Sequence, residues 1–397
     1  MRILICHNYY KNRGGEDEVF DYEKELLKQN GYEVIEYSKR SRDINSIYKN
    51  LGILINSFFS VKTYREINKI IKDKKPDIAH IHNIFPIISP SIFIVLKRNN
   101  IPIVQTIHNY RFYCSNGLSM KGGEICNRCE NLSFKSIFNI CNKDKKLYDL
   151  LLSLIIYFMR KFKVSDKINY FIAPSMFIKN KLVKCGIDKN KVILKRNSIR
   201  ANRESIGTEK LNSKYFTYIG RISEEKGIIG LIKAFKEIKD IELKVIGGGP
   251  LKRPIEEFIK KEKISNIKMI GFIVGEKKST IISNSIANII PSVCYENCPL
   301  VLIECLKEGV PVVANNIGAL SEYIKDGYNG YIYDFNDLNS LEEIILRLYN
   351  MGDVELCKLR DNCKNSFYTI FDERENFMVI DDLYKLLWKK YAEERND

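Results

Sequence analysis

The chain has 397 residues, of which 45% are hydrophobic and 28% are charged, and its formal net charge is +15. This length suits two domains or one large one, and the apolar fraction is that of a globular protein with a sizeable core. The positive charge favours an anionic partner, but the lysines are scattered and no nucleic-acid-binding motif is visible, so we expect no nucleic acid among the partners.

The first half of the chain alternates short apolar segments with helical patterns. Helical patterns cover residues 16–29 and 64–72, and the expected strands are 2–6, 33–37, 78–82, 103–108 and 170–173. The first strand is too short to be an apolar signal region, and the longest apolar run, residues 150–159, is too short to span a bilayer. We therefore expect a cytoplasmic protein.

A basic flank, residues 159–163, adjoins this apolar run. One interpretation is that the flank rests on an acidic membrane surface, which would place the protein at the inner face of the cell membrane. The other is a buried helix with a solvated basic end. Around residues 195–211 the chain becomes polar and charged without clear periodicity, which indicates a linker.

The alternation starts again after the linker. Expected strands are 215–219, 242–246, 268–270 and 286–290, with helical patterns at 228–238 and 255–263. Such alternation predicts an α/β protein with two doubly wound, Rossmann-like domains, whose parallel sheets face a central cleft. We expect domains at 1–200 and 201–371, and a C-terminal helix at 372–397 that packs back on the N-terminal domain. Ligands of such domains bind at the carboxyl ends of strands.

Two carboxylates in the second half are separated by seven residues. Glu296 precedes an apolar helix that Pro299 is suited to begin, and Glu304 lies more than one turn inside it. A carboxylate within an apolar helix is costly unless it is paired, and two hydroxyls of a sugar ring are suitable partners. The alternative is a pair of surface glutamates.

Three loops that follow strands have the composition of anion-binding turns. Arg221 and Lys226 lie in the loop 220–227 and suit a diphosphate, unless this is an ordinary basic loop. The glycine-rich turn 247–250 permits close backbone approach, and the segment 13–16 precedes a helix whose free N–H groups favour an anion. Simple flexible turns would explain the glycines of both segments.

All four histidines, His7, His80, His82 and His108, lie at or near the carboxyl ends of expected strands in the first half. We expect at least one of them to be functional. A metal site built from all four imidazoles is conceivable, but no cluster of acidic residues in the sequence supports it.

Four of the eleven cysteines lie in one loop-rich stretch, an insertion at residues 110–142. Cys126 and Cys129 have metal-ligand spacing, and Cys114 and Cys141 are placed symmetrically about them. Four thiolates would hold a structural zinc ion. The alternative is a set of free or partly buried thiols.

In order and spacing, these motifs resemble those of retaining glycosyltransferases of family 4, the group 1 type, which have the two-domain GT-B fold. The second half carries the ordered set 220–227, 247–251, 271–272, 291–304, 309–314, 316–322 and 326–330, and the first half matches at 14–15, 77–82 and 105–108. The resemblance covers nearly the whole chain.

The resemblance implies a role for each matching residue. Glu304 would hold the donor ribose, Glu296 the donor sugar, and Arg221 and Lys226 the diphosphate, while His108 would lie near the transferred sugar. The catalytic candidates are His108, Arg221, Lys226 and Glu296. Substrate-binding candidates are Gly15, Gly220, Gly248, Phe272, Pro299, Leu300, Val301 and Glu304. Candidates on the acceptor side are His7, His82 and Asn83.

Two positions depart from the family pattern. Many relatives have Gly-Phe after the first glutamate, where this chain has Asn297-Cys298, and many have Asp where it has Asn109. Both departures affect the expected contacts with the donor sugar.

The resemblance implies a hexosyltransferase that moves a sugar from a nucleotide-diphosphate sugar to a saccharide or lipid-linked acceptor. The anomeric configuration would be retained, no cofactor would be required for catalysis, and the product would be a surface polysaccharide, such as lipopolysaccharide or capsule, or a glycolipid. Two alternatives remain: a nucleotide-sugar hydrolase or epimerase of the same fold, and a non-catalytic protein that binds anionic surfaces through its charge.

Overall fold

The computed structural model describes residues 1–11, 13–40, 59–139, 141, 146–200, 214–335 and 337–396. It divides into two compact units. The first unit comprises Met1–Gly122, Cys126–Asn197 and Arg374–Asp397, and the second comprises Gly123–Ile125 and Ser198–Glu373. Most of the linker expected at 195–211 falls outside the described residues.

The first unit is built on a six-stranded parallel sheet with the order β2-β1-β3-β4-β7-β8. Its strands are β1 (Arg2–Tyr9), β2 (Glu33–Arg40), β3 (Ile78–Ile81), β4 (Ile103–Thr106), β7 (Tyr170–Ala173) and β8 (Val192–Leu194). The strand order changes direction between β1 and β3. In open α/β sheets, ligands bind beyond the carboxyl ends of strands at such a switch point.

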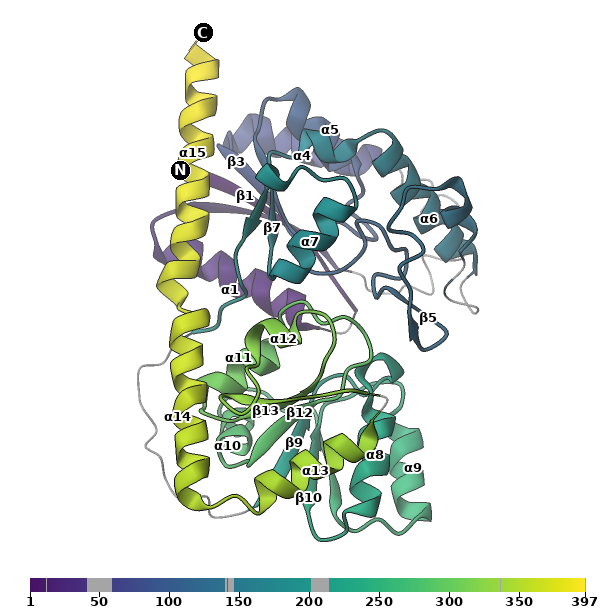
Figure 1. Ribbon diagram of the computed structural model, residues 1–397. Helices are drawn as coiled ribbons and strands as arrows, with labels where there is room; N and C mark the ends of the chain where they lie inside the picture. The colour runs from purple at the N-terminus through teal and green to yellow at the C-terminus, as the bar shows by residue number, and fades with distance from the viewer. Residues whose placement is uncertain are drawn as a thin grey trace. The chain divides into compact units, whose positions relative to one another are not determined.

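Helices cover this sheet (Figure 1). They are α1 (Gly15–Gln29), α4 (Val61–Lys74), α5 (Ser91–Arg98), α6 (Lys146–Lys161), α7 (Met176–Lys184) and α15 (Glu373–Asn396). The apolar run of the sequence is α6, and no helix among the described residues is both long and apolar enough to cross a bilayer.

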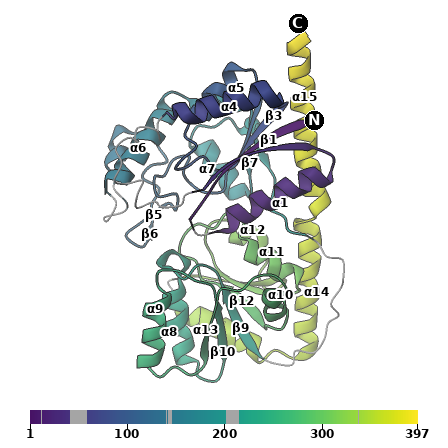
Figure 2. The ribbon, with the colours of Figure 1, turned by 180° about the vertical axis from the view of Figure 1, so that it is seen from behind.

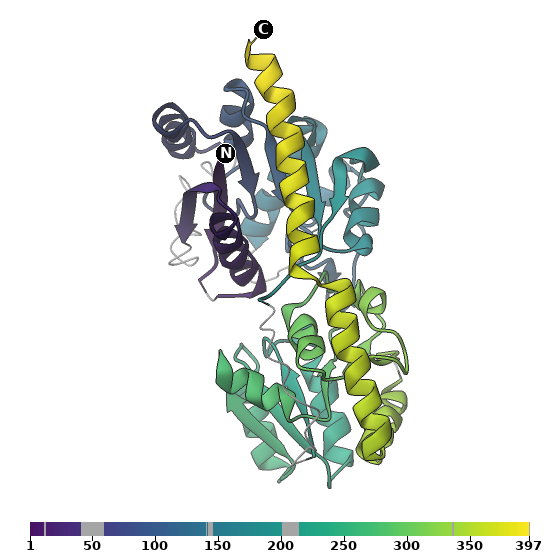
Figure 3. The same cartoon turned by 90° about the vertical axis from the view of Figure 1, so that its left-hand side faces the viewer.

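The C-terminal helix α15 belongs to the first unit, although it follows the second along the chain (Figure 3). Ile380, Tyr384 and Leu387 pack in one core with β1, β3, β4 and α1. Tyr32 also donates a hydrogen bond of 2.5 Å to Asp381. Burial of this apolar face fixes the helix against the first sheet.

The second unit has a six-stranded parallel sheet with the order β11-β10-β9-β12-β13-β14. Its strands are β9 (Tyr215–Ile219), β10 (Glu242–Ile246), β11 (Ile267–Gly271), β12 (Ala287–Ile290), β13 (Val312–Asn315) and β14 (Gly330–Tyr333). This is the strand order of a dinucleotide-binding fold, with its switch point between β9 and β12.

The helices of the second unit are α8 (Ile228–Glu237), α9 (Lys252–Lys261), α10 (Glu276–Ser283), α11 (Leu300–Lys307), α12 (Leu320–Tyr323), α13 (Leu338–Tyr349) and α14 (Asp353–Ile370). Helix α8 packs with α13, and α11 packs with α10 and α14 (Figure 2). The predicted α/β class with two Rossmann-like parallel sheets is therefore confirmed. One expected strand was too long: β4 ends at Thr106, so His108 lies in the loop that follows.

Candidate active site

The histidines of the first unit come together at the switch point of its sheet. His7 lies in β1, His80 lies in β3, and His82 and His108 follow β3 and β4. Parallel strands end at the same edge of a sheet, so neighbouring strands deliver these rings to one place. The rings of His82 and His108 stack with centroids 5.0 Å apart, and His82 Nδ1 lies 2.8 Å from His108 Nε2.

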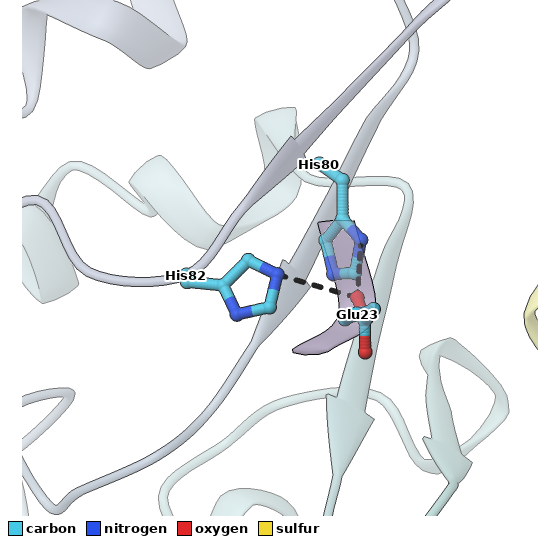
Figure 4. A group of neighbouring side chains, drawn as sticks. All are labelled: Glu23, His80 and His82. Carbon is cyan, nitrogen blue, oxygen red and sulfur yellow. Dashed lines mark ion pairs between the residues drawn. The ribbon is translucent and has the colours of Figure 1, made fainter. Parts of the chain in front are cut away.

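A carboxylate from α1 enters this histidine cluster. Glu23 Oε1 lies 3.1 Å from His80 Nδ1 and 3.3 Å from His82 Nε2 (Figure 4). Its other oxygen accepts a 2.6 Å hydrogen bond from Lys195. Glu23 was not among the residues predicted from the sequence, although a charged residue on the buried side of α1, between Phe20 and Leu27, was a signal available there.

The pKa values of Glu23, His82 and His108 are all lowered. Burial alone would raise the pKa of Glu23, but Lys195 and His80 hold it well below its ordinary value. Burial lowers the pKa of His82 to about 3, and burial together with the neighbouring His82 lowers the pKa of His108. Both imidazoles are therefore neutral at pH 7.

The three residues predicted on the acceptor side are buried. His7 is 0% exposed and lies 2.7 Å from Asp17, while His82 and Asn83 are 4% and 5% exposed. Asn83 donates hydrogen bonds to the Asn8 carbonyl and to Glu16. Their contacts orient neighbouring groups, whereas the half-buried His108 is the more accessible member of the cluster.

Among the described residues, one group has the geometry of a metal-ligand set. One ligand atom each of Glu23, His80 and His82 lies within 4.8 Å of the others. However, Lys195 already supplies the counter-ion of this carboxylate, and a cation bound beside the lysine ammonium would meet repulsion. We interpret the cluster as hydrogen bonds from Lys195 to Glu23 and between His82 and His108, joined by close approaches of Glu23 Oε1 to His80 and His82 that are not directed hydrogen bonds.

The second unit holds a lysine–glutamate pair at its own switch point. Lys226 follows β9 and Glu296 follows β12, and the two side chains approach to 2.5 Å. Ser292 donates a second hydrogen bond to the same oxygen of Glu296. Burial opposes the charge of Lys226, but the Glu296 carboxylate outweighs it and raises the pKa of the lysine. The lysine side chain remains 29% exposed, so its cation can also reach a ligand.

Backbone contacts lock the two loops of this pair together. The Glu225 carbonyl accepts hydrogen bonds from the N–H groups of Val293 and Cys294. Gly227 has φ +66°, and a Cβ there would lie 1.8 Å from the Pro291 carbonyl oxygen. Only glycine fits this approach, which explains the glycine after Lys226.

Glu304 lies on α11 and pairs with a lysine that was not among the predicted site residues. Lys278, from α10, donates a 2.6 Å hydrogen bond to Glu304. The lysine and glutamate side chains are 18% and 23% exposed. Pro299 is the N-cap of α11 and not its first helical residue, so the N–H groups of Leu300 and Val301 open the helix.

The glycine-rich turn serves two purposes. Cβ atoms at Gly247 and Gly249 would meet backbone oxygens of Gly220 and Ile222 at 1.9 and 2.3 Å, so these glycines are required by the fold. A Cβ at Gly248 would meet no atom within 4 Å, and Gly248 is exposed. Gly248 is therefore the member of this turn that is open to a ligand.

The remaining candidates of the second unit are exposed. The Arg221 side chain is 63% exposed and lies 3.8 Å from Glu225, and Phe272 is 72% exposed. Neither is held in place by a buried contact in the described structure. In the first unit, Gly15 is the first residue of α1, behind the N-cap Gly14.

The four clustered cysteines lie in one loop-rich region of the chain. The hairpin β5 (Met120–Lys121) and β6 (Glu124–Ile125) leads into Cys126, and a 3₁₀ helix (Phe134–Phe138) lies between Cys129 and Cys141. Burial, then the neighbouring Cys114 and Asp149, then Cys129 and Cys126, raise the pKa of Cys141 to about 12. Among the described residues, no three of these sulfurs lie within 4.8 Å of one another, and the zinc site stays a prediction.

Models of two protein families match the chain. The family "Glycosyltransferase Family 4" matches residues 24–203, and "Glycosyl transferases group 1" matches residues 200–368. Together the two matches run through both Rossmann-like units.

Individual relatives agree with these matches. An uncharacterized glycosyltransferase of Methanocaldococcus jannaschii is 28% identical and aligns with 98% of this chain and 99% of its own. The UDP-Gal:alpha-D-GlcNAc-diphosphoundecaprenol alpha-1,3-galactosyltransferase of Escherichia coli is 22% identical over 90% of this chain and 87% of its own. The crystal structure of a glycosyltransferase from Rickettsia africae superimposes with a TM-score of 0.72 at 19% identity, covering 98% of both chains. The chain thus belongs to the family 4, group 1 type of glycosyltransferases and has their GT-B fold.

Proposed function

We propose that the protein is a retaining glycosyltransferase that moves a hexose from a nucleotide-diphosphate sugar to a saccharide or lipid-linked acceptor in the synthesis of a cell-surface polysaccharide or glycolipid. The observation that carries the proposal is the Lys226–Glu296 pair at the switch point of the second sheet. It joins a partly exposed cation to a carboxylate where such a sheet binds its ligand.

The second unit would bind the donor. Lys226 and the exposed Arg221 would neutralise the charge that grows on the diphosphate as it leaves, assisted by the N–H groups of Leu300 and Val301. Glu304 would accept hydrogen bonds from the ribose, with Lys278 holding its carboxylate in place. Glu296 would do the same for the sugar.

The reaction would exchange one bond for another at the anomeric carbon. The bond from that carbon to the diphosphate oxygen breaks, and the acceptor hydroxyl oxygen bonds to the same carbon on the same face. The departing phosphate oxygen takes the hydroxyl proton. These cations and N–H groups would perform the task of a divalent metal, so the proposal includes no catalytic cofactor.

A lipid-linked acceptor requires contact with a membrane surface, and the first unit offers a suitable patch. Phe134, Phe138 and Phe162 are each more than 60% exposed. Tyr157 links them, because its ring centroid lies 5.7 Å from that of Phe134 and 5.5 Å from that of Phe158, which stacks on Phe162. The exposed lysines of this aromatic patch are Lys135, Lys161 and Lys163. Exposed aromatic rings beside lysines suit the interface of an acidic bilayer at the cytoplasmic face.

The donor is tested by thermal unfolding with UDP, GDP, ADP, dTDP and their common sugar conjugates. UDP comes first, because the name of the Escherichia coli relative specifies UDP-Gal. A ligand at about 100 times its Kd stabilises the folded state by about 2.7 kcal/mol. We expect one nucleotide to stabilise the wild type and to bind Glu304→Ala at least about tenfold more weakly.

Glu308→Ala is the matched control, because Glu308 adjoins the same helix but pairs with Ser279. No stabilisation by any nucleotide or nucleotide sugar would contradict the proposal. Rapid release of sugar from the donor without an acceptor would instead favour a hydrolase of the same fold.

A further inference from the structure

Glu23 is linked to His108 through His82, and this link selects the nitrogen of His108 that carries the proton. We propose that Glu23 is a positioning residue that holds His108 in the Nε2–H tautomer, so that Nδ1 of His108 accepts a hydrogen bond from a substrate hydroxyl. The part that concerns the substrate rests on the proposed function; the part that concerns the tautomer does not.

The first step is the charge of Glu23. Lys195 donates a 2.6 Å hydrogen bond to Oε2, and both side chains are nearly inaccessible to solvent. An ionised carboxylate has no proton to give and only accepts hydrogen bonds. His82 Nε2 lies 3.3 Å from Glu23 Oε1, so this nitrogen must present a proton, because a lone pair there would face a negative charge.

The proton position on His82 in turn determines the proton position on His108. A neutral imidazole carries one proton, so His82 with a proton on Nε2 has a lone pair on Nδ1. That Nδ1 lies 2.8 Å from Nε2 of His108. Nε2 of His108 is therefore the donor, and the other nitrogen of the same neutral ring, Nδ1, is an acceptor.

The other groups around Glu23 have partners that are compatible with these proton positions on His82 and His108. Tyr384 OH lies 2.6 Å from His80 Nδ1, and Thr106 Oγ1 lies 2.8 Å from His80 Nε2. Glu23 Oε1 also lies 3.1 Å from His80 Nδ1, so the same reasoning places a proton on that nitrogen, facing Glu23 and Tyr384, and Thr106 donates to His80 Nε2. His7 is paired separately with Asp17, so neither His7 nor His80 competes for the proton between His82 and His108.

The substitution Glu23→Gln should switch the tautomers of His82 and His108. The Lys195 ammonium would keep the amide oxygen on its side, which turns the amide NH₂ toward His82. His82 Nε2 would then accept and its Nδ1 would donate. His108 would then accept the hydrogen bond from His82 on Nε2 and carry its own proton on Nδ1.

The test is nitrogen NMR of the full-length protein labelled with ¹⁵N-histidine, at neutral pH. The chain has four histidines, so four ring systems appear, and single substitutions of His7 and His80 assign two of them. We expect the wild type to show His82 and His108 protonated on Nε2. A wild-type His108 protonated on Nδ1 would overturn the proposal without any substitution of Glu23.

In Glu23→Gln the tautomers of both rings should switch. Asp17→Asn is the matched control, because it changes the carboxylate next to His7 and should leave His82 and His108 unchanged. Under the proposed function, Glu23→Gln should also lower kcat by at least about tenfold. Nucleotide binding by the second unit should persist. A tautomer switch without nucleotide binding by the wild type would contradict the function and leave the tautomer inference standing.

A different region carries a second proposal. We infer that Cys114, Cys126, Cys129 and Cys141 bind one structural zinc ion. The cysteines follow the spacing of 11, 2 and 11 intervening residues, and the segment between them has two-residue strands and one 3₁₀ helix as its regular structure. Such a segment has little core of its own, which is the situation in which a metal stabilises a loop-rich region.

Backbone hydrogen bonds anchor two of the four cysteines. The Cys126 N–H donates to the Ser119 carbonyl at 2.7 Å, which ends the β5–β6 hairpin at the Cys126–Cys129 turn. The Cys141 N–H donates a 2.8 Å hydrogen bond to Asp149, which ties Cys141 to helix α6. Zinc holds thiolates at about 2.3 Å, so binding would draw the four sulfurs together.

Elemental analysis of the purified full-length protein tests this site. We expect about one zinc per chain, slow release to a chelator, and a zinc content reduced at least severalfold in Cys126→Ser and in Cys141→Ser. Cys357→Ser, a partly exposed cysteine in α14, is the matched control and should keep its zinc. A metal-free wild type that does not bind added zinc, or zinc retained in both variants, would overturn the inference.

Discussion

The two units share the parallel Rossmann-like sheet but place charge differently at its switch point. In the first unit the Glu23–Lys195 pair is buried among histidines. In the second unit Lys226 and Lys278 pair with glutamates while keeping 29% and 18% of their side chains exposed. A buried pair orients its neighbours, whereas a partly exposed cation can still neutralise a ligand. The first unit is therefore organised for hydrogen-bond geometry, whereas the second keeps its cations accessible to the diphosphate of the proposed donor.

Removing the cation of the second unit should have the largest effect on activity. Lys226→Met should reduce kcat about 10²- to 10³-fold, because preorganised charge at a leaving group contributes about 3–4 kcal/mol. Steady-state kinetics with the donor identified by thermal unfolding would measure this loss. Lys236→Met, which removes a surface lysine paired with Glu262, is the control and should retain activity. Equal rates for both variants would refute the assignment of Lys226 to the diphosphate.

Lowering the pH should destabilise the first unit before the second. The pKa of His82 is about 3 in the folded protein and about 6.5 in an unfolded chain, so the unfolded state binds more protons between these values. Stability from this group is present above pH 6.5 and is lost as pH falls, by about 2 kcal/mol at pH 5. Glu23, whose pKa is also lowered, adds to the loss at lower pH.

The stability that Lys226 contributes changes with pH in the opposite direction. Its raised pKa gives stability that is fully present below its ordinary value and is lost at high pH, so acid leaves it unchanged. Hydrogen exchange between pH 7.5 and 5, corrected for intrinsic rates, should show protection falling in β3 and β4 before β9 and β12. Loss of protection first in β9 and β12 would contradict this difference between the units.

The smallest effect concerns the aromatic patch of the first unit. Replacing Phe134, Phe138 and Phe162 together by serine should weaken binding to vesicles of acidic phospholipid at least about tenfold, since each ring buries apolar surface. Tyr368→Ser is the control, because Tyr368 is 51% exposed on α14 of the second unit. Vesicle sedimentation with acidic and neutral lipid measures the effect. Equal binding of the triple variant and the wild type would remove the patch from the proposed function.

Much of the fold followed from local patterns. Alternating apolar strands and helical segments predicted two parallel-sheet units, because right-handed crossovers leave few other arrangements. The boundary of β4 was misplaced at His108 because the strand pattern continues in sequence after the ladder ends at Thr106. The strand β8 was not predicted, since three residues carry too little periodicity.

Some features of the candidate site were also visible in the sequence, and others appeared only in the structure. The motifs around Lys226, Glu296 and Glu304 were visible in the sequence because each is a short segment following a strand. Their protein partners were less visible: Lys278 comes from another helix, and the contact of Gly227 with Pro291 joins two loops. The sequence predicted sugar hydroxyls as partners of the glutamates, and the structure adds a lysine to each.

By itself, the sequence determined the class of fold, the order of the motifs and the presence of four histidines at strand ends. These depend on interactions over a few residues, which periodicity and turn chemistry record. The tertiary structure decided that Glu23 and Lys195, 172 residues apart, form a buried pair, and that Tyr384 of the last helix reaches His80. Such pairings depend on how helices dock on a sheet, and no local pattern encodes which distant charge will compensate another in the interior.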